Sequence, residues 1–257
     1  MAKWTAFPYP GEYNFDAGSV RKNWARLHVG DAEPLPKDTG LLEAWSMFHN
    51  GEFQKAVDAA LKAGTPGITL ANKATSIYAT YLEKKEKARL EMYMEVAQRA
   101  EAQARQDPQN PNAYYWQAYA LGRYSQGISV AKALAQGLGG KVKVALENTI
   151  KLQPRHADAH IALGAFHAEV IDKVGSLIGS MTYGAKKDVG LQLFQQALKI
   201  NFQSAIAMIE YANAMVMLEG DKKMKDATRL YEQAAAFKPF DAAERLDVEM
   251  AKAELQD

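Results

Sequence analysis

The C-terminal half of this chain repeats one short pattern, and this repetition narrows the choice of folds more than any other feature. An apolar segment ends at a polar stop, and a new segment that opens with Ala follows. Three segments align in this way, at residues 149–157, 197–205 and 234–242. The first and third stops contain Pro154 and Pro239, and proline ends a helix because it has no N–H to donate. Internal similarity at intervals of a few tens of residues is typical of stacked helical hairpins that share one core.

Several residues have the spacing that marks the tetratricopeptide repeat (TPR), and the chain resembles this family. In the family, a large residue, a Leu-Gly pair and an aromatic residue mark the first helix of a hairpin, while Ala, an aromatic, Ala and Pro mark the second. The first set corresponds to His160, Leu163, Gly164 and His167, and the second to Ala227, Tyr231, Ala234 and Pro239. Two earlier units have fewer marks, namely Pro108, Pro111, Trp116 and Ala120, and before them Gly51, Phe53, Ala56, Ala60 and Ala63.

The resemblance implies an all-α fold, a solenoid of about four helical hairpins with a capping helix at the C-terminal end. TPR units repeat every 34 residues or so, whereas Trp116 and His160 are 44 residues apart and Pro154 and Phe202 are 48 apart. Two units therefore contain inserts of about 10 and about 14 residues. Phe202 also stands where the family usually has Pro.

Composition limits the classes of function that this chain can have. Of the 257 residues, 31 are Lys or Arg and 30 are Asp or Glu, so the net charge of +1 does not favour nucleic acid as a partner. The chain has no Cys, which excludes disulfides and thiolate chemistry. No apolar run reaches the ~18 residues of a membrane span, and the first residues have no apolar signal core. We therefore predict a protein that does not span a membrane and is cytoplasmic, or periplasmic if a signal peptide has been removed.

Residues 1–37 form an arm before the helical-repeat domain, which we place at residues 38–257. The arm is rich in aromatic residues and proline, including Trp4, Phe7 and Tyr9. Aromatic side chains gain much from burial, so we expect the arm to be irregular but packed. It either caps the first hairpin or mediates self-association into a homo-oligomer.

The two inserts, at residues 127–140 and 174–184, are apolar and rich in glycine. Surface loops are usually polar, so these segments require burial or a ligand. One interpretation is that they line a pocket for a small apolar ligand, formed by Leu134, Leu138, Leu177, Ile178, Met181 and Tyr183. The other is that they add turns of helix that cover the core of the solenoid. In these inserts the chain is similar to TPR-like proteins with extended hairpins, such as the regulator-of-microtubule-dynamics family and the TPR subunit associated with TRAP transporters.

The concave face of a TPR solenoid is lined by one side of each first helix, and here that side is largely apolar and aromatic. The residues expected on it are Leu42, Trp45, Phe48, Tyr114, Gln117, Leu121, Tyr124, Asp158, Ile161, Ala165, Ile206, Ile209 and Asn213. Such a groove suits an amphipathic helix or an extended peptide as partner. Alternatively, the arm or the C-terminal helix of the same chain fills it. TPR domains that clamp a C-terminal carboxylate use Lys, Asn and Arg on this face, and Asn213 alone fits.

Three histidines, His156, His160 and His167, raise the question of a metal site. His160 and His167 occupy packing positions of the repeat, which favours a role in the core over metal binding. No order of residues typical of nucleophilic catalysis is present. We therefore expect no metal, no cofactor and no catalysis.

The leading hypothesis is a scaffold that binds a protein or peptide in the apolar groove, and the alternative is a carrier or transporter-accessory protein that holds a small apolar ligand between the inserts.

Overall fold

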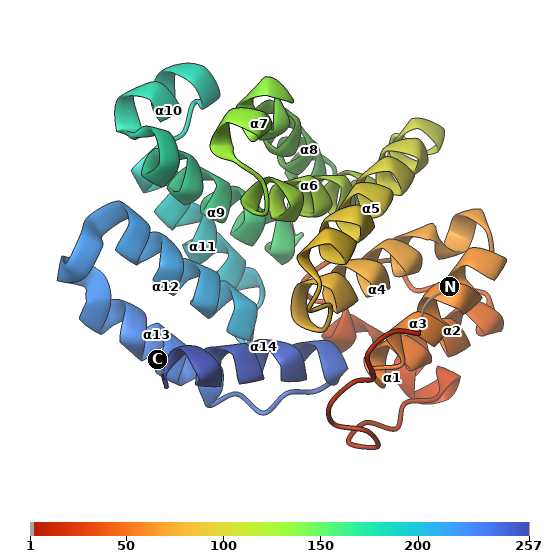
Figure 1. Cartoon of the computed structure of the whole chain (residues 1–257). Helices are drawn as coiled ribbons and strands as arrows, with labels where there is room; N and C mark the ends of the chain where they lie inside the picture. Colours follow the sequence, from red (N-terminus) through yellow and green to blue (C-terminus); the bar gives the residue numbers. More distant parts are fainter. Residues whose placement is uncertain (1–2, 257) are drawn as a thin grey trace.

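The computed structural model describes residues 3–256, and within this range it consists of helices with no strand (Figure 1). The helices are α1 (Ala17–Leu27), α2 (Thr39–His49), α3 (Phe53–Lys62), α4 (Ile68–Tyr81), α5 (Glu86–Gln106), α6 (Pro111–Gln126), α7 (Val130–Ala135), α8 (Leu138–Leu152), α9 (Ala157–Val174), α10 (Ser176–Tyr183), α11 (Lys187–Ile200), α12 (Ala205–Glu219), α13 (Met224–Ala235) and α14 (Ala242–Glu254). Two short 3₁₀ helices, η1 (Thr65–Gly67) and η2 (Gly220–Lys223), precede α4 and α13.

Ten of these helices pair into hairpins: α2 with α3, α4 with α5, α6 with α8, α9 with α11 and α12 with α13. Each hairpin packs on the next along the chain, and α14 packs on the last. This arrangement confirms the predicted all-α hairpin solenoid with a C-terminal capping helix. The described part of the chain has five hairpins where the sequence predicts about four. The additional hairpin is α4–α5, whose two segments read as helices but carry none of the residues that mark a repeat.

Gly164, from the Leu-Gly pair of the repeat, lies where α9 and α11 are closest. A Cβ atom at this position would come within 2.8 Å of the ring of Phe194. That ring has no exposed surface and therefore has little room to move. The glycine thus allows the two helices of this hairpin to pack closely.

Helix α6 begins at a cap formed by Asn110. The side chain of Asn110 accepts hydrogen bonds from the backbone N–H groups of Asn112 and Ala113, and Pro111 occupies the first helical position. Both features are favourable at a helix start, where backbone N–H groups lack partners. Asn112, the second residue of α6, is fully buried and belongs to the polar network described below.

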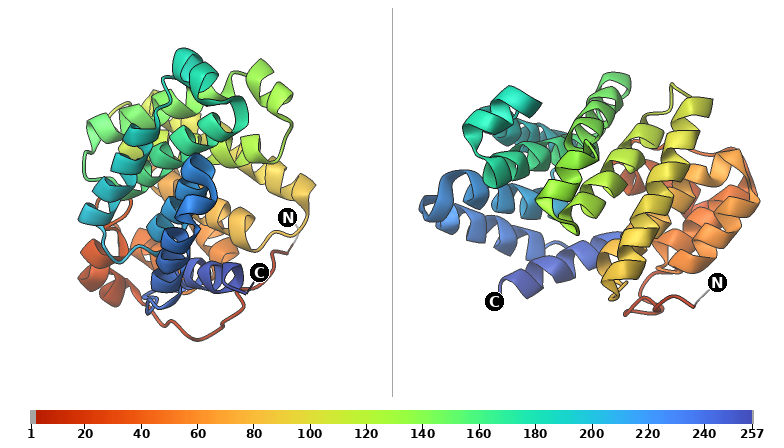
Figure 2. Two further views of the ribbon diagram at one scale, coloured as in Figure 1. Left: turned by 90° about the vertical axis from the view of Figure 1, so that its left-hand side faces the viewer. Right: turned by 45° about the horizontal axis from the view of Figure 1, so that its top comes forward.

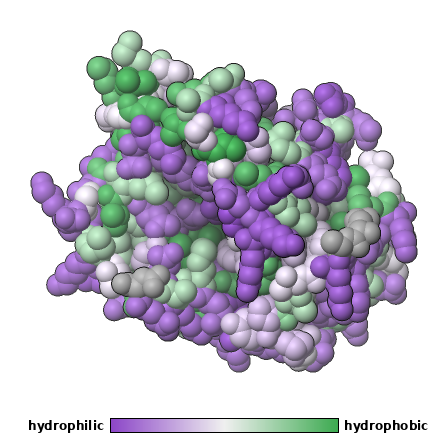
Figure 3. Space-filling view, viewed as in Figure 1, coloured by the Kyte–Doolittle hydropathy of each residue, from purple (hydrophilic) through white to green (hydrophobic). Residues whose placement is uncertain are grey.

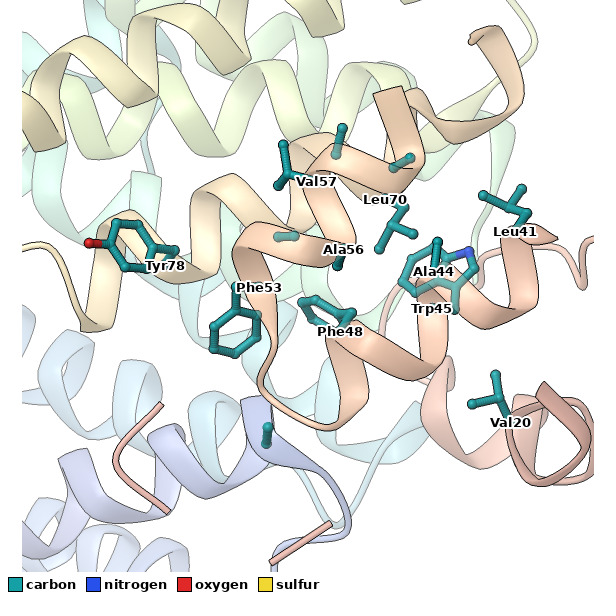
Figure 4. Close-up of a cluster of buried hydrophobic side chains, with 14 of the residues drawn as sticks. Val20, Leu41, Ala44, Trp45, Phe48, Phe53, Ala56, Val57, Leu70 and Tyr78 are labelled. Carbon is teal, nitrogen blue, oxygen red and sulfur yellow. The ribbon is translucent and has the colours of Figure 1, made fainter. Parts of the chain in front are cut away.

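The arm at residues 3–37 packs along the first two hairpins. The ring of Trp4 stacks on that of Tyr78, with centroids 4.0 Å apart. Trp24 of α1 meets the edge of Trp45 on α2 at 5.5 Å. Figure 4 shows the core beneath the arm, where Val20 of α1 faces the cluster that contains Trp45 and Phe48.

The two ends of the solenoid meet, because α14 reaches back to the first hairpin (Figures 1 and 2). The Nδ1 atom of His49 on α2 lies 2.7 Å from Oδ2 of Asp241, the residue that caps α14. The guanidinium group of Arg26 on α1 donates two hydrogen bonds to the carboxylate of Glu244, at 2.5 and 2.9 Å. The concave side is therefore bordered by helices from both ends of the chain and is partly covered.

The two inserts form short helices, α7 between α6 and α8 and α10 between α9 and α11, which lie next to each other at one edge of the ring (Figure 1). Their surroundings differ. Several residues in and around α7 take part in the wall of this partly covered space, whereas α10 exposes most of its apolar side chains. The two inserts thus have equivalent places in their hairpins but different surroundings.

Candidate functional site

A cavity of about 310 Å³ lies inside the ring of helices, and we call it the inner cavity. Its wall comes from the first helices of four hairpins (α4, α6, α9 and α12), from α8, from residues 26–31 of the arm and from α14. This volume is at the small end of the range found for ligand pockets in proteins. The inner cavity thus collects side chains that are more than 200 residues apart in the sequence.

Most of the basic side chains in the wall are neutralised by acidic neighbours. The ammonium group of Lys73 on α4 lies 2.6 Å from the carboxylate of Asp31 in the arm. Arg123 on α6 lies 2.9 Å from Glu210 on α12, and Arg26 pairs with Glu244 as described above. Of the four basic residues that line the cavity, Lys173 alone is exposed to solvent.

Asp158, the second residue of α9, has a different environment. Its side chain lines the inner cavity, and it makes no side-chain hydrogen bond or ion pair with any residue of the described chain. Its backbone N–H donates to the carbonyl oxygen of Gly30 at 3.0 Å. Burial raises the pKa of the Asp158 carboxyl to about 7, and the negative charge of Asp31 adds to this effect. The site therefore contains a carboxyl group with a high pKa and no partner.

Aromatic side chains surround this carboxyl group. Tyr115 on α6 is 5% exposed and lines the cavity, and its ring packs 4.6 Å from that of His156. Within residues 3–256 its hydroxyl has no hydrogen-bond partner, whereas that of the neighbouring Tyr119 bonds to Thr80 at 2.8 Å. Trp116 also lines the wall, together with Tyr81 and Phe166.

A second acidic group of the wall belongs to the capping helix. Asp247 of α14 accepts a hydrogen bond from the hydroxyl of Tyr81 on α4. Burial raises the pKa of Asp247 to about 8, although the hydrogen bond from Tyr81 lowers it in part. This contact joins the capping helix to the second hairpin.

A buried polar network holds the arm against the wall. The side-chain amide of Asn112 donates to the carbonyl oxygen of Asp31 at 3.1 Å and to the carboxylate of Glu33 at 2.6 Å. Its amide oxygen lies 2.9 Å from Nε2 of His156. Burial raises the pKa of Glu33 to about 8. Since buried polar groups are costly unless they are hydrogen-bonded, this network fixes the arm where it covers α6 and α9.

The three histidines of the repeat junction do not converge. His156 bonds to Asn112, His160 lies 2.9 Å from the carbonyl oxygen of Pro154, and His167 accepts a hydrogen bond from the backbone N–H of Lys186 at 3.0 Å. No group of three or more potential metal ligands occurs in the part of the chain that the structure describes. Each histidine therefore has a structural contact of its own.

Of the thirteen residues that we expected on the concave face, four line the inner cavity, namely Asp158, Ile161, Ala165 and Ile206. Trp45 and Phe48 do not, because they are 1% and 0% exposed and lie in the core under the arm. On α12, Ile209 packs in a core with Val248 of α14, and Asn213 accepts a hydrogen bond from Tyr231 of α13. These last four residues hold the solenoid together.

On α6 the prediction is one residue out of register. The residues predicted there are Tyr114, Gln117, Leu121 and Tyr124, and none of them lines the inner cavity, whereas the residue after each one does, namely Tyr115, Ala118, Gly122 and Ser125. Tyr124 borders a separate shallow pocket between α5 and α7. By contrast, the prediction for α9 places Asp158, Ile161 and Ala165 correctly in the wall.

The residues predicted for an insert pocket are brought together only in part. Leu134 and Tyr183 line the inner cavity, and Leu138 is 3% exposed in the core of the third hairpin. Leu177, Ile178 and Met181 on α10 are 74%, 57% and 80% exposed. Figure 3 shows the hydrophobic surface that gathers over α10, at the upper left. The short helix α10 has no neighbour on this side, so its apolar residues face solvent.

Sequence comparison finds no match, neither among family models nor among curated proteins. Among solved structures, the chain is similar to a thermophilic TPR protein of Thermus thermophilus, with a TM-score of 0.58 at 14% identity. The match covers 83% of this chain and 97% of that chain. This similarity confirms the predicted TPR-like fold, and at this identity it concerns the fold alone.

In residues 3–256, no helix combines the length and the hydropathy that crossing a membrane requires.

Proposed function

We propose that this protein is a non-catalytic binding protein of the TPR type, and that its inner cavity holds a small organic molecule. The observation that carries the proposal is that the arm and α14 partly cover the concave face. The arm covers it on one side through Asp31 and Gly30, and α14 covers it on another through Asp247 and Glu244. An α-helix with its side chains is about 10 Å wide, so a partner helix would have to displace these elements. A small molecule fits the space without such a change.

The composition of the wall supports a ligand that has both an apolar and a polar part. Apolar side chains such as Ile77, Leu146 and Ile161 line one part of the cavity. Asp158 and Tyr115 supply polar groups without partners in another part. Pockets that bind small molecules typically combine a mostly apolar lining with a few convergent polar groups.

Two glycines allow a sharp test. Gly122 on α6 lines the cavity, and a Cβ atom there would meet no atom within 4 Å, so Gly122→Phe directs a ring into open space. Gly140 on α8 is exposed and also has no atom within 4 Å of an added Cβ, so Gly140→Phe is the matched control. We expect native mass spectrometry to show a mass that denaturation releases from the natural protein and from Gly140→Phe, but not from Gly122→Phe. A bare natural protein, or the same bound mass in all three, would contradict the proposal.

A protein partner is a second candidate, which the exposed apolar side of α10 favours. Leu177, Ile178 and Met181 place three apolar side chains on one short helix, and clustered apolar surface of this kind marks interaction sites. Leu177→Asp should abolish a specific association that Gly140→Phe leaves intact, measured by co-purification under identical conditions. If Leu177→Asp retains every partner of the natural protein, this second candidate is wrong.

A further inference from the structure

Acidic side chains outnumber basic ones in the wall of the inner cavity, with seven carboxyl groups against four basic groups. Lys73, Arg26 and Arg123 are each within 2.9 Å of a carboxylate oxygen, and their charges are therefore neutralised locally. Asp158 has no such partner. Asp247 and Glu169 also line the cavity, and their hydrogen-bond partners, Tyr81 and Gln126, are uncharged.

The groups around Asp158 are of the kinds that stabilise a positively charged ligand group. The Tyr115 hydroxyl, which also lacks a partner, can accept a hydrogen bond, and ionised Asp158 accepts on both oxygens. The aromatic faces of Tyr115, Trp116 and Tyr119 lie in the same wall, and cations are attracted to such faces. The field of Asp158 is also felt at Tyr115, since this negative charge, after burial itself, raises the pKa of the Tyr115 hydroxyl.

We propose that the inner cavity binds an organic amine, with its ammonium group hydrogen-bonded to Asp158 and Tyr115 and its apolar chain along Ile77 and Ile161. This inference rests on the proposed function and names the chemical class of the ligand. A charge-assisted hydrogen bond to the carboxylate offsets the cost of taking the ammonium group out of water. An anionic ligand would instead face Asp158, because Lys173, the basic residue of the wall outside the ion pairs described above, is 15 residues further along α9. A metal ion would find one free carboxylate there and no cluster of three ligands in residues 3–256.

The local backbone is built to keep Asp158 in place and accessible. Gly30 of the arm is so close that a Cβ atom there would lie 2.5 Å from Oδ1 of Asp158. The Asp158 N–H is held by the Gly30 carbonyl oxygen, and the arm itself is held by Asn112. The arm therefore presents the carboxylate to the cavity without covering it with a side chain.

The test uses three probes with the same six-carbon chain and different head groups: n-hexylamine, 1-hexanol and hexanoate. Binding is measured by isothermal titration calorimetry at pH 8 with the natural protein, Asp158→Asn, Tyr115→Phe, Gly122→Phe and Gly140→Phe. We expect hexylamine to bind at least about tenfold more tightly than hexanol, as for a buried charge-assisted hydrogen bond. Asp158→Asn should remove this preference while leaving the affinity for hexanol unchanged. Tyr115→Phe should weaken hexylamine binding about threefold to tenfold, and Gly140→Phe should leave it unchanged.

Failure of this inference can be told apart from failure of the proposed function. If hexanol or hexanoate binds as tightly as hexylamine and Gly122→Phe abolishes this binding, the cavity holds small molecules but is not a cation site. If hexylamine binds but Asp158→Asn binds it equally well, the assignment of Asp158 is overturned. If none of the probes binds, the amine inference is overturned, and the native mass of the purified protein decides the proposed function independently. Circular dichroism of each variant establishes that its fold is intact.

Discussion

His49 and Asp241 are 192 residues apart in the sequence, yet Nδ1 of the histidine lies 2.7 Å from a carboxylate oxygen of the aspartate. Both side chains are almost fully buried. Burial lowers the pKa of His49. Burial alone would raise the pKa of Asp241, but the contact with His49, the hydrogen bond from the backbone of Glu244 and the charge of Lys73 together lower it. This contact joins the first hairpin to the capping helix, and it is one of the bonds that close the ring around the inner cavity.

The first prediction concerns the contribution of this contact to stability. Asp241 also caps α14 by accepting a hydrogen bond from the backbone N–H of Glu244. Asp241→Ala removes the cap, at a cost of about 1 kcal/mol, and leaves a buried His49 nitrogen unpartnered, at a further cost of about 1–3 kcal/mol. We expect the free energy of unfolding, measured in urea at pH 7, to fall by about 2–4 kcal/mol.

Asp38 provides the matched control. It caps α2 in the same way, accepting from the backbone N–H of Leu41 at 2.8 Å, but it is exposed and has no buried partner. Asp38→Ala should therefore cost only about 1 kcal/mol. If the two variants lose equal stability, the His49 contact adds nothing to the cap.

The second prediction concerns two glycines with opposite surroundings. At Gly164 an added Cβ atom meets the buried ring of Phe194 at 2.8 Å, so Gly164→Ala should destabilise the fold by about 1–3 kcal/mol. At Gly122 the added atom meets nothing within 4 Å, and alanine favours the helix, so Gly122→Ala should stabilise it by about 0.5–1 kcal/mol. Thermal unfolding of both variants measures the difference. Shifts of the same sign would contradict the packing of α9 on α11 described here.

The sequence predicts the individual helices of this fold better than it predicts the contact between the two ends of the solenoid. Two local signals, Pro154 and the repeat around Gly164, each predict a boundary or a packing position that the structure contains. The bond between His49 and Asp241 depends on how five hairpins accumulate curvature, and no local pattern encodes that. For the same reason the sequence could not show that Trp45 lies beneath the arm instead of lining a groove.

Within single helices, too, the sequence predicts only some of the residues that line the candidate site. On α9, polar and small residues separate the apolar positions, so only one helical register puts an apolar face toward the cavity. Asp158 and Ile161 are therefore predicted on that face. On α6, aromatic residues occupy neighbouring positions such as Tyr114 and Tyr115, so two registers have almost the same apolar periodicity. Lys73 was missed because its helix carries no mark of the repeat.

The third prediction separates the two kinds of insert residue. Leu177 on α10 is 74% exposed, and Leu177→Asp should change the free energy of unfolding by no more than about 0.5 kcal/mol. Leu138, at the start of α8, is 3% exposed, and Leu138→Asp should cost more than about 3 kcal/mol because it buries a charge without a partner. Urea unfolding of the two variants measures this contrast. A large loss for Leu177→Asp would mean that α10 packs against another element.

The last prediction is a dependence of stability on pH that arises from Asp158. Its pKa rises from the ordinary value of 3.8 in the unfolded chain to about 7 in the fold, mainly through burial. Below about pH 4 the carboxyl is protonated in both states and has no effect. As the pH rises toward 7, the unfolded state loses this proton first, so the fold becomes less stable, and the loss is complete above pH 7. Asp158→Asn should therefore be more stable than the natural protein at pH 8, by about 1–4 kcal/mol.

The charged neighbours of Asp158 do not cause a similar change of stability between pH 4 and pH 8. Although burial alone would raise it, Lys73 and His28 hold the pKa of Asp31 well below its usual range, and the pKa of Lys73 itself is raised by Asp31. This pair therefore stays charged between pH 4 and pH 8, while the pKa of the Tyr115 hydroxyl lies well above its usual value. Urea unfolding of the natural protein and of Asp158→Asn at pH 4, 6 and 8 should give a difference that is near zero at pH 4 and grows with pH. A constant difference would mean that the Asp158 carboxylate is stabilised by a partner inside the cavity, such as a bound cation that stays with the protein.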